Sequence, residues 1–599
     1  MVHLEFIPGP GGVRSVRPNE AGSVVWEAKM ENPEAQRSAA QAAEALAPEA
    51  GLIAALDPVS FFESLFQVGA GVARNPTVAL RALIRYSAAT MTAGYASAAR
   101  WWGASLPNVI EPQPSDKRFR DSAWQENPLY SYLHQNYLLR CQLLQDLIDD
   151  SGVDDPTAAK ARMIAGMITD AVSPANFLFT NPVALKKAFD TGGASVARGL
   201  RNFLDDVAHN DGLPRKVDPS AFKVGESLAA TPGKVVFRNE LMELIQYEAQ
   251  TKKTFEIPLL CSPPWINKYY IMDLAPGRSY IEWAVQHGHT VFSISYRNPD
   301  ETMRDVTLDD YLLSGPIRAI EVMQDITGAD QVNVVGLCLG GSLTAMLLAY
   351  LATTGDDRVR SMSLLNTLLD FSEPGMLGSF TDPRTIARME NKMQSKGFLD
   401  SRDMALTFDL LRANDLIYNY VASNWLMGQD PPSFDILAWN SDSTRMPAAM
   451  HSFYLRSCYL KNELANGEME LAGTRLRLDE LTQDAYIVAA VNDHITPWKG
   501  SYKTTHLLKS DIRFVLSSSG HIAGIVNPPS PKAKHWTNEQ LPPDPESWLQ
   551  TATEHQGSWW EDWTTWIEER AGNKRKPPPV GGEGFPVLGD APGRYVLEH

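Results

Sequence analysis

The stretch that decides the fold runs Gln331-Val-Asn-Val-Val-Gly-Leu-Cys338-Leu-Gly-Gly341 and continues into an apolar run over 342–353. Its first part has the β-branched composition of a short strand, and its last part has the composition of a buried helix. Between them stands Gly-x-Cys-x-Gly, with a glycine two residues to either side of Cys338. A strand that turns directly into a helix at such a motif presents the central side chain on a strained, accessible turn. The pattern therefore predicts a nucleophile at Cys338.

A nucleotide-binding fold is the alternative interpretation of a glycine-rich turn after a strand. A dinucleotide fingerprint places its third glycine further along, and an acidic residue ends a strand about 20 residues later. Neither feature follows Gly341. A thiol at the start of the helix also has its pKa lowered there, and the N–H of Leu339 would point at a developing oxyanion. These features favour a catalytic cysteine over a buried structural one.

Two later predicted strands end in the residues that such a nucleophile needs. Asp493 follows the strand predicted at 485–491, and His521 follows the strand predicted at 512–517. An acid and then a base, each just after a later strand, is the chain order that a nucleophile turn of this kind predicts. We therefore predict a triad of Cys338, His521 and Asp493. His494 lies beside the acid and is the alternative base, although its position favours a supporting role.

From about residue 233 onward, short β-branched runs alternate with longer helical ones. This alternation predicts a parallel sheet with crossover helices, and strands are expected at 234–238, 256–262, 290–296, 331–336, 360–365, 485–491 and 512–517. The separation of Cys338 from Asp493 far exceeds one crossover unit. The excess is an interval at about 368–450, rich in Met, Phe, Trp and Pro. We predict an α/β-hydrolase fold with a cap insertion after the sixth strand.

The chain before the sheet divides into two parts. Residues 1–55 are rich in Ala, Glu, Pro and Gly, so a partly ordered tail is expected. Residues 56–232 carry apolar side chains at helical spacing, which predicts a mainly helical N-terminal domain. The catalytic domain is expected over 233–596, and residues 597–599 could be the remnant of a tag.

Composition excludes several classes of protein. The net charge of −17 on 599 residues argues against a nucleic-acid partner, because phosphate binding needs a basic face. The four cysteines are widely and irregularly spaced, so neither a metal site nor a disulfide framework is expected. The N-terminus lacks a signal peptide pattern, and no apolar run is long enough to cross a membrane. A cytoplasmic protein is therefore expected.

Beyond the predicted triad, the sequence resembles the polyhydroxyalkanoate synthases, and the match runs from about residue 118 to 596. The matching segments include Ser173-Pro-Ala-Asn-Phe177, Pro263-Pro-Trp-Ile-Asn-Lys-Tyr-Tyr-Ile-Met-Asp273, Tyr296-Arg-Asn-Pro-Asp300, Trp439-Asn-Ser-Asp442, Tyr454-Leu-Arg456, Tyr459-Leu-Lys-Asn-Glu-Leu464, Ser519-Gly-His-Ile-Ala-Gly-Ile-Val-Asn-Pro-Pro529 and Pro592-Gly-Arg-Tyr-Val596. Two departures are visible. Members of the family commonly carry Trp where Tyr296 stands, and the residue at Trp265 varies.

The resemblance implies a single-subunit-type synthase that polymerises (R)-3-hydroxyacyl-CoA into a polyester and releases CoA. The chemistry would proceed through a covalent acyl-cysteine on Cys338, with 3-hydroxybutyryl-CoA as the expected substrate and medium-chain acyl groups as the alternative. Asp493 would orient His521 or help to activate the incoming 3-hydroxyl group. The implied partners are the acyl-CoA, the nascent polyester and its granule surface, and a second copy of the chain in a homodimer. No metal or organic cofactor is implied.

Further site residues follow from the same resemblance. The backbone N–H groups of Leu339 and of Trp265 or Ile266 would bind the oxyanion. The candidates for lining the site or supporting the triad are Asp273, Tyr296, Arg297, Trp439 and His494. Two other classes of function stay open from the sequence: a cysteine-dependent thioesterase or hydrolase of the same fold, and a non-catalytic granule scaffold.

Overall fold

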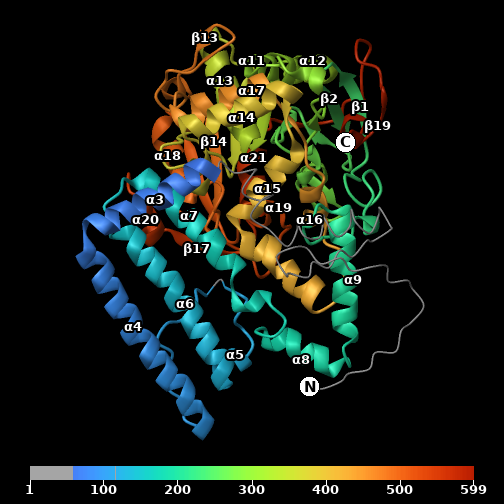
Figure 1. The fold of residues 1–599 in the computed structure, drawn as a ribbon. Coiled ribbons are helices and arrows are strands. Elements are labelled where there is room, and N and C mark those ends of the chain that lie inside the picture. The colour runs from blue at the N-terminus through green and yellow to red at the C-terminus, as the bar shows by residue number, and fades with distance from the viewer. Residues whose placement is uncertain (1–57, 115) are drawn as a thin grey trace, which may run out of the picture.

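The computed structural model describes residues 58–114 and 116–599 as a helical N-terminal lobe joined to a large sheet domain (Figure 1). The tail predicted at 1–55 lies outside the described residues. The long helices of the lobe are α3 (Pro58–Arg74), α4 (Pro76–Ala99), α6 (Pro128–Asp149), α7 (Asp155–Ala171), α8 (Pro182–Asp190) and α9 (Ala194–His209).

Three of these helices begin at a side-chain cap that is encoded locally. Asn127, Asp154 and Asn181 each accept a backbone N–H of the first helical turn, and a proline follows within two residues. Such caps satisfy N–H groups that have no acceptor inside the helix, and the proline fixes a helical φ. These three helices therefore begin where the sequence places Asn-Pro or Asp-x-Pro.

Helices α4 and α6 run side by side and point away from the sheet domain (Figure 1). Small side chains allow the two helices to approach, because Ala82, Ala93 and Ala96 are buried on α4. A buried hydrogen bond of 3.2 Å joins the hydroxyls of Ser97 and Ser131 across the pair. No helix within the described residues combines the length and apolarity needed to cross a membrane.

The sheet domain is built on one mixed sheet, whose strands in spatial order are β17, β16, β15, β14, β9, β8, β4, β7, β2, β1 and β19. Pairing is parallel from β7 to β15 and antiparallel at both ends. The bounds are β1 (Gly233–Arg238), β2 (Met242–Tyr247), β4 (Leu259–Ser262), β7 (Val291–Tyr296), β8 (Val332–Leu337), β9 (Val359–Leu365), β14 (Asp484–Ala490), β15 (Ile512–Ser517), β16 (Lys534–Thr537), β17 (Thr553–Gln556) and β19 (Gly589–Asp590). The predicted α/β-hydrolase fold, preceded by a helical region, is confirmed.

All seven predicted strands are present, but one of them begins later than expected. The strand predicted at 256–262 begins at Leu259 because Pro258, just before it, has no N–H to donate to a neighbouring strand. Four strands of the sheet were not predicted: β2, β16, β17 and β19. All four pair antiparallel with their neighbours, outside the parallel centre of the sheet.

Helices cover both faces of the sheet and bury its two apolar surfaces. Helices α12 (Arg318–Thr327), α13 (Leu339–Thr354) and α18 (Trp498–Leu507) pack on one face. Helices α10 (Tyr280–Gln286) and α21 (Trp559–Glu568) pack on the other. Trp559, Trp560 and Trp563 are all buried in this second core.

Residues 366–483 form a long inserted segment between β9 and β14, after the sixth strand in chain order of the sheet's central eight strands. It contains α14 (Pro383–Lys396), α15 (Ser401–Leu411), α16 (Asp435–Ser441) and α17 (Ala448–Tyr454), with π-helical turns η8 (Asn414–Tyr418), η9 (Val421–Leu426) and η10 (Leu455–Leu460). Its strands are two residues long. Its role as a cap stays a prediction.

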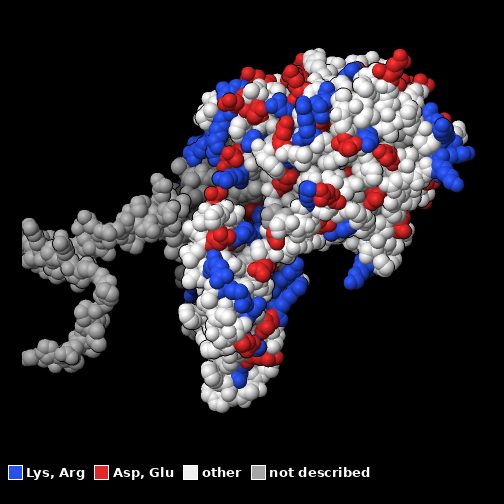
Figure 2. Space-filling view, turned by 90° about the vertical axis from the view of Figure 1, so that its right-hand side faces the viewer, with Lys and Arg blue, Asp and Glu red and all other residues white. Residues whose placement is uncertain are grey.

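Charged side chains of both signs are interspersed over the face shown in Figure 2. The net negative charge of the chain is therefore not gathered into one acidic patch on this face.

All four cysteines are free thiols.

Candidate active site

Cys338 occupies the turn between strand β8 and helix α13, with φ 54° and ψ −117°. A positive φ is strained for any residue with a side chain, and such strain persists only where the surrounding fold enforces it. The Cys338 N–H donates to the carbonyl of Leu365 at 2.8 Å, and the Thr367 hydroxyl donates to the Cys338 carbonyl at 3.3 Å. Contacts to the end of β9 and the residues after it therefore hold the turn.

The glycines of the motif are required by close approach of backbone to backbone. A Cβ atom on Gly336 would lie 2.5 Å from the carbonyl oxygen of Gly340. A Cβ atom on Gly340 would lie 2.0 Å from the carbonyl oxygen of Ser262, at the end of β4. Real Cβ contacts are not this short, so only glycine fits at either position. The strand, the helix and the β4 loop meet here because these two residues lack side chains.

Asp493 and His521 come together at the ends of adjacent parallel strands, β14 and β15. His521 Nδ1 lies 2.7 Å from Asp493 Oδ2, and both side chains are buried. The other carboxylate oxygen, Oδ1, accepts the N–H groups of Ile495 at 2.9 Å and Thr496 at 2.8 Å. The Thr496 hydroxyl adds a bond of 2.7 Å to Oδ2. The carboxylate is thus fixed on both of its oxygens.

The electrostatics of the site favour a charged imidazole. Burial lowers the pKa of His521, but the Asp493 carboxylate and the Cys338 sulfur outweigh it and raise that pKa to about 10. Burial raises the pKa of Asp493, but His521 and Thr496 outweigh it and lower that pKa overall. An opposite charge and hydrogen bonds to the charged form produce shifts in these directions. The predicted triad residues therefore form one coupled group, and the catalytic role of each stays a prediction.

The predicted oxyanion donors lie beside this group in the chain. Leu339 is the first residue of α13, so its N–H has no acceptor within the helix. Trp265 and Ile266 follow β4, in the loop whose carbonyls at Ser262 and Pro263 approach Gly340 most closely. The Trp265 ring is buried and makes an edge contact of 5.8 Å with Tyr454. Its indole N–H is buried without a partner among the described residues.

His494 lies next to the acid but does not share its hydrogen bonds. Its Nδ1 atom is buried without a partner among the described residues. Burial and the nearby positive charge of Arg412 lower the pKa of His494 to about 4. An imidazole with a pKa of about 4 is a weak proton acceptor, and its Nδ1 has no carboxylate partner among the described residues, in contrast to that of His521.

The four other predicted lining residues have hydrogen-bond partners or contacts of their own. Asp273 is buried and accepts hydrogen bonds from Thr231, Ser279 and Tyr247. Tyr296 ends β7, with its ring 5.2 Å from the ring of Tyr311 and its buried hydroxyl unpartnered in the described chain. Arg297 pairs with Asp300 at 2.6 Å, and Trp439 Nε1 donates to the carbonyl of Lys268 at 2.8 Å. These partners lie outside the triad, so a role for the four in binding substrate stays a prediction.

Two tyrosines from the inserted segment were not predicted as site residues. Burial, together with the Cys338 sulfur among other nearby groups, raises the pKa of both Tyr454 and Tyr459. Their rings lie 5.5 Å apart in an edge contact, and Phe371 packs 4.9 Å from the ring of Tyr459. Both tyrosines stand in segments that carry the family resemblance. That resemblance is the sequence signal that could have identified them.

The fold defines a protein of the α/β-hydrolase class, with a cysteine at the turn between β8 and α13. A family model described as "alpha/beta hydrolase fold" matches residues 275–528. A second model, described as "Poly-beta-hydroxybutyrate polymerase (PhaC) N-terminus", matches residues 115–284. The matched regions cover β1, β2, the parallel centre of the sheet and part of the helical lobe.

Similar curated proteins narrow the class to a family. The chain is 41% identical to a poly(3-hydroxyalkanoate) polymerase of Methylorubrum extorquens, over 92% of each chain. It is 43% identical to poly(3-hydroxyalkanoate) polymerase subunit PhaC of Cupriavidus necator, over 80% of this chain and 83% of that one. It is also 43% identical to poly(3-hydroxyalkanoate) polymerase 2 of Ectopseudomonas oleovorans, over 82% and 87%. The chain belongs to the poly(3-hydroxyalkanoate) polymerase family.

Proposed function

We propose that this chain polymerises (R)-3-hydroxyacyl-CoA, with 3-hydroxybutyryl-CoA as its substrate, into a polyester and releases CoA. The observation that carries the proposal is the thiol of Cys338 on a strained turn beside the buried pair of His521 and Asp493. Membership of the polymerase family supports the same chemistry.

Loading begins with attack of the Cys338 thiolate on the thioester carbonyl. A new carbon–sulfur bond forms to Cys338 while the carbon–sulfur bond to CoA breaks, and the CoA thiolate takes the proton held by His521. One thioester replaces another, so the step is close to neutral in free energy. The N–H of Leu339, with that of Trp265 or Ile266, would stabilise the oxyanion in between.

Elongation follows when the 3-hydroxyl group of another acyl unit attacks the acyl-cysteine. A carbon–oxygen bond forms, the carbon–sulfur bond to Cys338 breaks, and the hydroxyl proton passes to His521. The product is an oxygen ester, which is more stable than the thioester it replaces, so the growing chain is driven forward. Asp493 holds the imidazole in the orientation that both steps require.

Water has to be excluded from the acyl-cysteine, or the enzyme would release free acid. The aromatic side chains of Tyr454, Tyr459 and Phe371, all from the inserted segment, support this part of the proposal. Cys338 and Tyr459 both pack against the apolar cluster that contains Tyr454 and Phe371. The raised pKa of each tyrosine keeps its hydroxyl protonated, and therefore weakly nucleophilic, at neutral pH. In this proposal the inserted segment acts as the cap.

The proposal places the enzyme in the cytoplasm, at the surface of the polyester granule, as a homodimer. Helix α4 supports the granule contact, since Leu80, Leu83, Ile84, Met91 and Tyr95 are all at least half exposed. Monomeric soluble proteins rarely leave a large contiguous apolar surface uncovered. Analytical ultracentrifugation of the purified chain tests the dimer.

Incubation with (R)-3-hydroxybutyryl-CoA tests the function. We expect CoA release together with turbidity from insoluble polymer. CoA release with soluble free acid would instead identify a thioesterase. Cys338→Ala should abolish CoA release, and Cys338→Ser should lower kcat by roughly 10³-fold or more because a hydroxyl is a poorer nucleophile. Full CoA release by Cys338→Ala would contradict the assigned nucleophile, and no CoA release by the unmodified chain would favour a scaffold.

A further inference from the structure

The N-terminal lobe and the inserted segment are joined through helix α9. Figure 1 shows α9 beside the helices of the inserted segment, although α9 and this segment are far apart in the sequence. The rings of Phe203 and Trp425 meet edge to face, with centroids 5.0 Å apart. Trp425 Nε1 donates to the buried carboxylate of Asp206 at 2.8 Å. Asn202 donates to the carbonyl of Asn424 at 3.2 Å, so the contact includes backbone as well as side chains.

Two glycines allow the backbones of this interface to touch. A Cβ atom on Gly199, in the middle of α9, would lie 1.9 Å from the carbonyl oxygen of Trp425. A Cβ atom on Gly428 would lie 2.3 Å from the carbonyl oxygen of Ser195, at the start of the same helix. Each side of the interface thus carries a glycine where the other side approaches. An incidental contact between neighbouring domains does not require this fit from both partners.

Buried charge pairs connect the same two parts of the chain. Lys216 Nζ lies 2.7 Å from Asp409 Oδ1, and only 16% and 7% of their side chains are exposed. Lys160 of α7 pairs with Asp382, at the start of α14. Burial raises the pKa of Asp409, and the Lys216 ammonium opposes that rise. A buried charge left without its partner is costly, so each pair holds the inserted segment at one position against the lobe.

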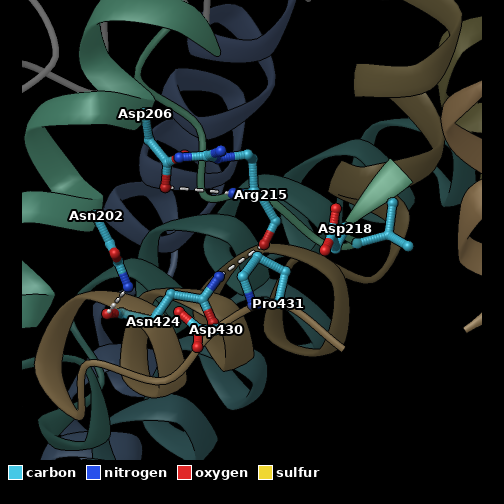
Figure 3. Close-up of a pocket in the computed structure, with 8 residues that line it drawn as sticks. Asn202, Asp206, Arg215, Asp218, Asn424, Asp430 and Pro431 are labelled. Atoms are coloured by element: carbon cyan, nitrogen blue, oxygen red, sulfur yellow. Dashed lines mark hydrogen bonds and ion pairs between the residues drawn. The ribbon is translucent and has the colours of Figure 1, made fainter. Parts of the chain in front are cut away.

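A pocket of about 260 Å³ lies within this interface (Figure 3). Its polar groups largely bond to one another: Asp206 to Arg215, Arg215 to Asn424, and Asn424 to Asn202 (Figure 3). The pocket is therefore a space left between two joined surfaces, and we assign it no ligand.

On its other side, the held segment reaches the loop of the predicted acid. Leu410, Leu411 and Ile417 form one apolar cluster with Leu377. A Cβ atom on Gly375, in the same turn as Leu377, would lie 3.6 Å from the carbonyl oxygen of His494. Arg412 and Asp415 are also among the charges that act on the pKa of His494. His494 is the neighbour of Asp493, which bonds to His521. A series of contacts therefore runs from α9, through residues 409–429 and the turn at 375–377, to the loop of Asp493 and His494.

We propose that Gly199, Asp206 and Lys216 are positioning residues: they hold residues 409–429 of the inserted segment in place, and this segment in turn positions the loop of Asp493 and His494. The N-terminal lobe then contributes to turnover without touching the substrate. The proposal uses the proposed polymerase activity as its readout. If the unmodified chain releases no CoA, the proposed function fails first, and this inference is judged by hydrogen exchange and His494 titration instead.

The decisive variant is Gly199→Ala, with Gly166→Ala as its matched control. Both residues lie inside helices of the lobe, and alanine favours a helix over glycine at either position. A Cβ atom on Gly166 meets nothing within 4 Å, whereas the one on Gly199 meets the Trp425 backbone. Any difference between the two variants therefore reports on the interface and not on the helix.

We expect Gly199→Ala to keep its circular dichroism spectrum while hydrogen exchange over 409–429 becomes faster. We also expect kcat/KM for the acyl-CoA to fall by roughly tenfold, within the range found for mutations along coupled networks. The pKa of His494 should rise from about 4, because burial and Arg412 both lower it in the native protein. Nuclear magnetic resonance of labelled histidines, assigned with His494→Gln, measures that change.

A charge exchange provides a second test with rescue. Lys216→Asp alone should reproduce the effects of Gly199→Ala, and Lys216→Asp with Asp409→Lys should recover most of the lost kcat/KM. A general loss of folding would not be repaired by a second substitution of this kind. The proposal is overturned if Gly199→Ala matches Gly166→Ala in kcat/KM and exchange, if exchange changes without any change at His494 or in turnover, or if the double exchange recovers nothing.

Discussion

Asp493 holds His521 through Oδ2 at 2.7 Å, while its Oδ1 accepts two backbone N–H groups from Ile495 and Thr496. These hydrogen bonds occupy both oxygens of the carboxylate. A hydroxyl group of the substrate could reach it only by displacing one of them. The geometry therefore favours Asp493 as the residue that orients His521 over direct activation of the incoming 3-hydroxyl group.

Replacing Asp493 with Asn separates those two roles. The amide oxygen can still accept the backbone N–H groups, but its NH₂ group faces His521 Nδ1 and favours the wrong tautomer. We expect kcat to fall by roughly 10²–10⁴-fold, as for other acids that orient a catalytic histidine. Rapid-quench measurement of the first CoA released should show the loading step slowed as well. A normal loading burst followed by failed elongation would assign Asp493 to the hydroxyl step.

Because the pKa of His521 is raised, the free energy of unfolding should fall as the pH rises into the alkaline range. Below about pH 6.5 the proton is bound in both the folded and the unfolded chain, so the charged pair contributes fully to stability. Between there and about pH 10 the unfolded chain has lost the proton that the folded chain retains, so the free energy of unfolding falls. Asp493 titrates far below this window, because its pKa is lowered.

Urea unfolding from pH 6 to 10 measures this dependence. The unmodified chain should lose stability more steeply across the window than Asp493→Asn, which lacks the charge that raises the pKa. The difference between the two curves is the informative quantity, because other groups titrate equally in both proteins. Parallel curves would show that the folded-state pKa of His521 is not raised by Asp493.

His521 and His494 should respond very differently to the same substitution. His521→Gln removes the base that the carboxylate orients, so CoA release should fall by roughly 10³-fold or more. His494→Gln removes an imidazole that is already neutral, with a pKa of about 4, so we expect less than a tenfold change. Steady-state CoA release at pH 7.5 compares the two. A larger loss of CoA release in His494→Gln would instead identify His494 as the base.

The sequence predicted the parallel centre of the sheet but not all of its antiparallel strands. Strand β2 was missed because Glu243 and Gln246 interrupt its apolar pattern, although every residue in it is buried. Glu243 accepts the N–H groups of Arg594 and Tyr595, and Gln246 bonds to Pro579 and Gly581. Glu243 also pairs with Arg238, five residues away. The backbone partners of both polar residues come from the far end of the chain, where no local pattern can reveal them.

The grouping of Cys338, Asp493 and His521 could be predicted because each is marked locally, by a glycine motif or by the end of an apolar strand, and their catalytic roles stay predictions. The contacts around these residues could not be predicted. Tyr454 and Tyr459 pack in the same apolar cluster as Cys338, but they stand in the inserted segment, which has no regular period that relates it to the sheet. The contact between Gly199 and Trp425 likewise depends on how two separate domains meet. Spatial neighbours of this kind have no common signal in a single sequence.

Helix α4 presents apolar side chains at the spacing of one helical face, and this yields a last prediction. Leu80, Leu83 and Ile84 are 59%, 50% and 60% exposed and lie three and four residues apart. Replacing all three with Gln keeps helix propensity but removes the surface proposed to meet the polyester. Burying about half of each side chain contributes about 2 kcal/mol or more in total, so binding should weaken by at least about tenfold.

Co-sedimentation with amorphous polyhydroxybutyrate particles measures that binding. Val587→Gln with Leu588→Gln is the matched control, because these residues are 47% and 46% exposed and lie in the sheet domain, outside the lobe. We expect the control to bind as the unmodified chain does, and both variants to retain CoA release before polymer accumulates. Equal binding by the α4 variant would show that granule contact is made elsewhere. Equal weakening by the control would mean that any exposed apolar residue serves, and that α4 has no special part in the contact.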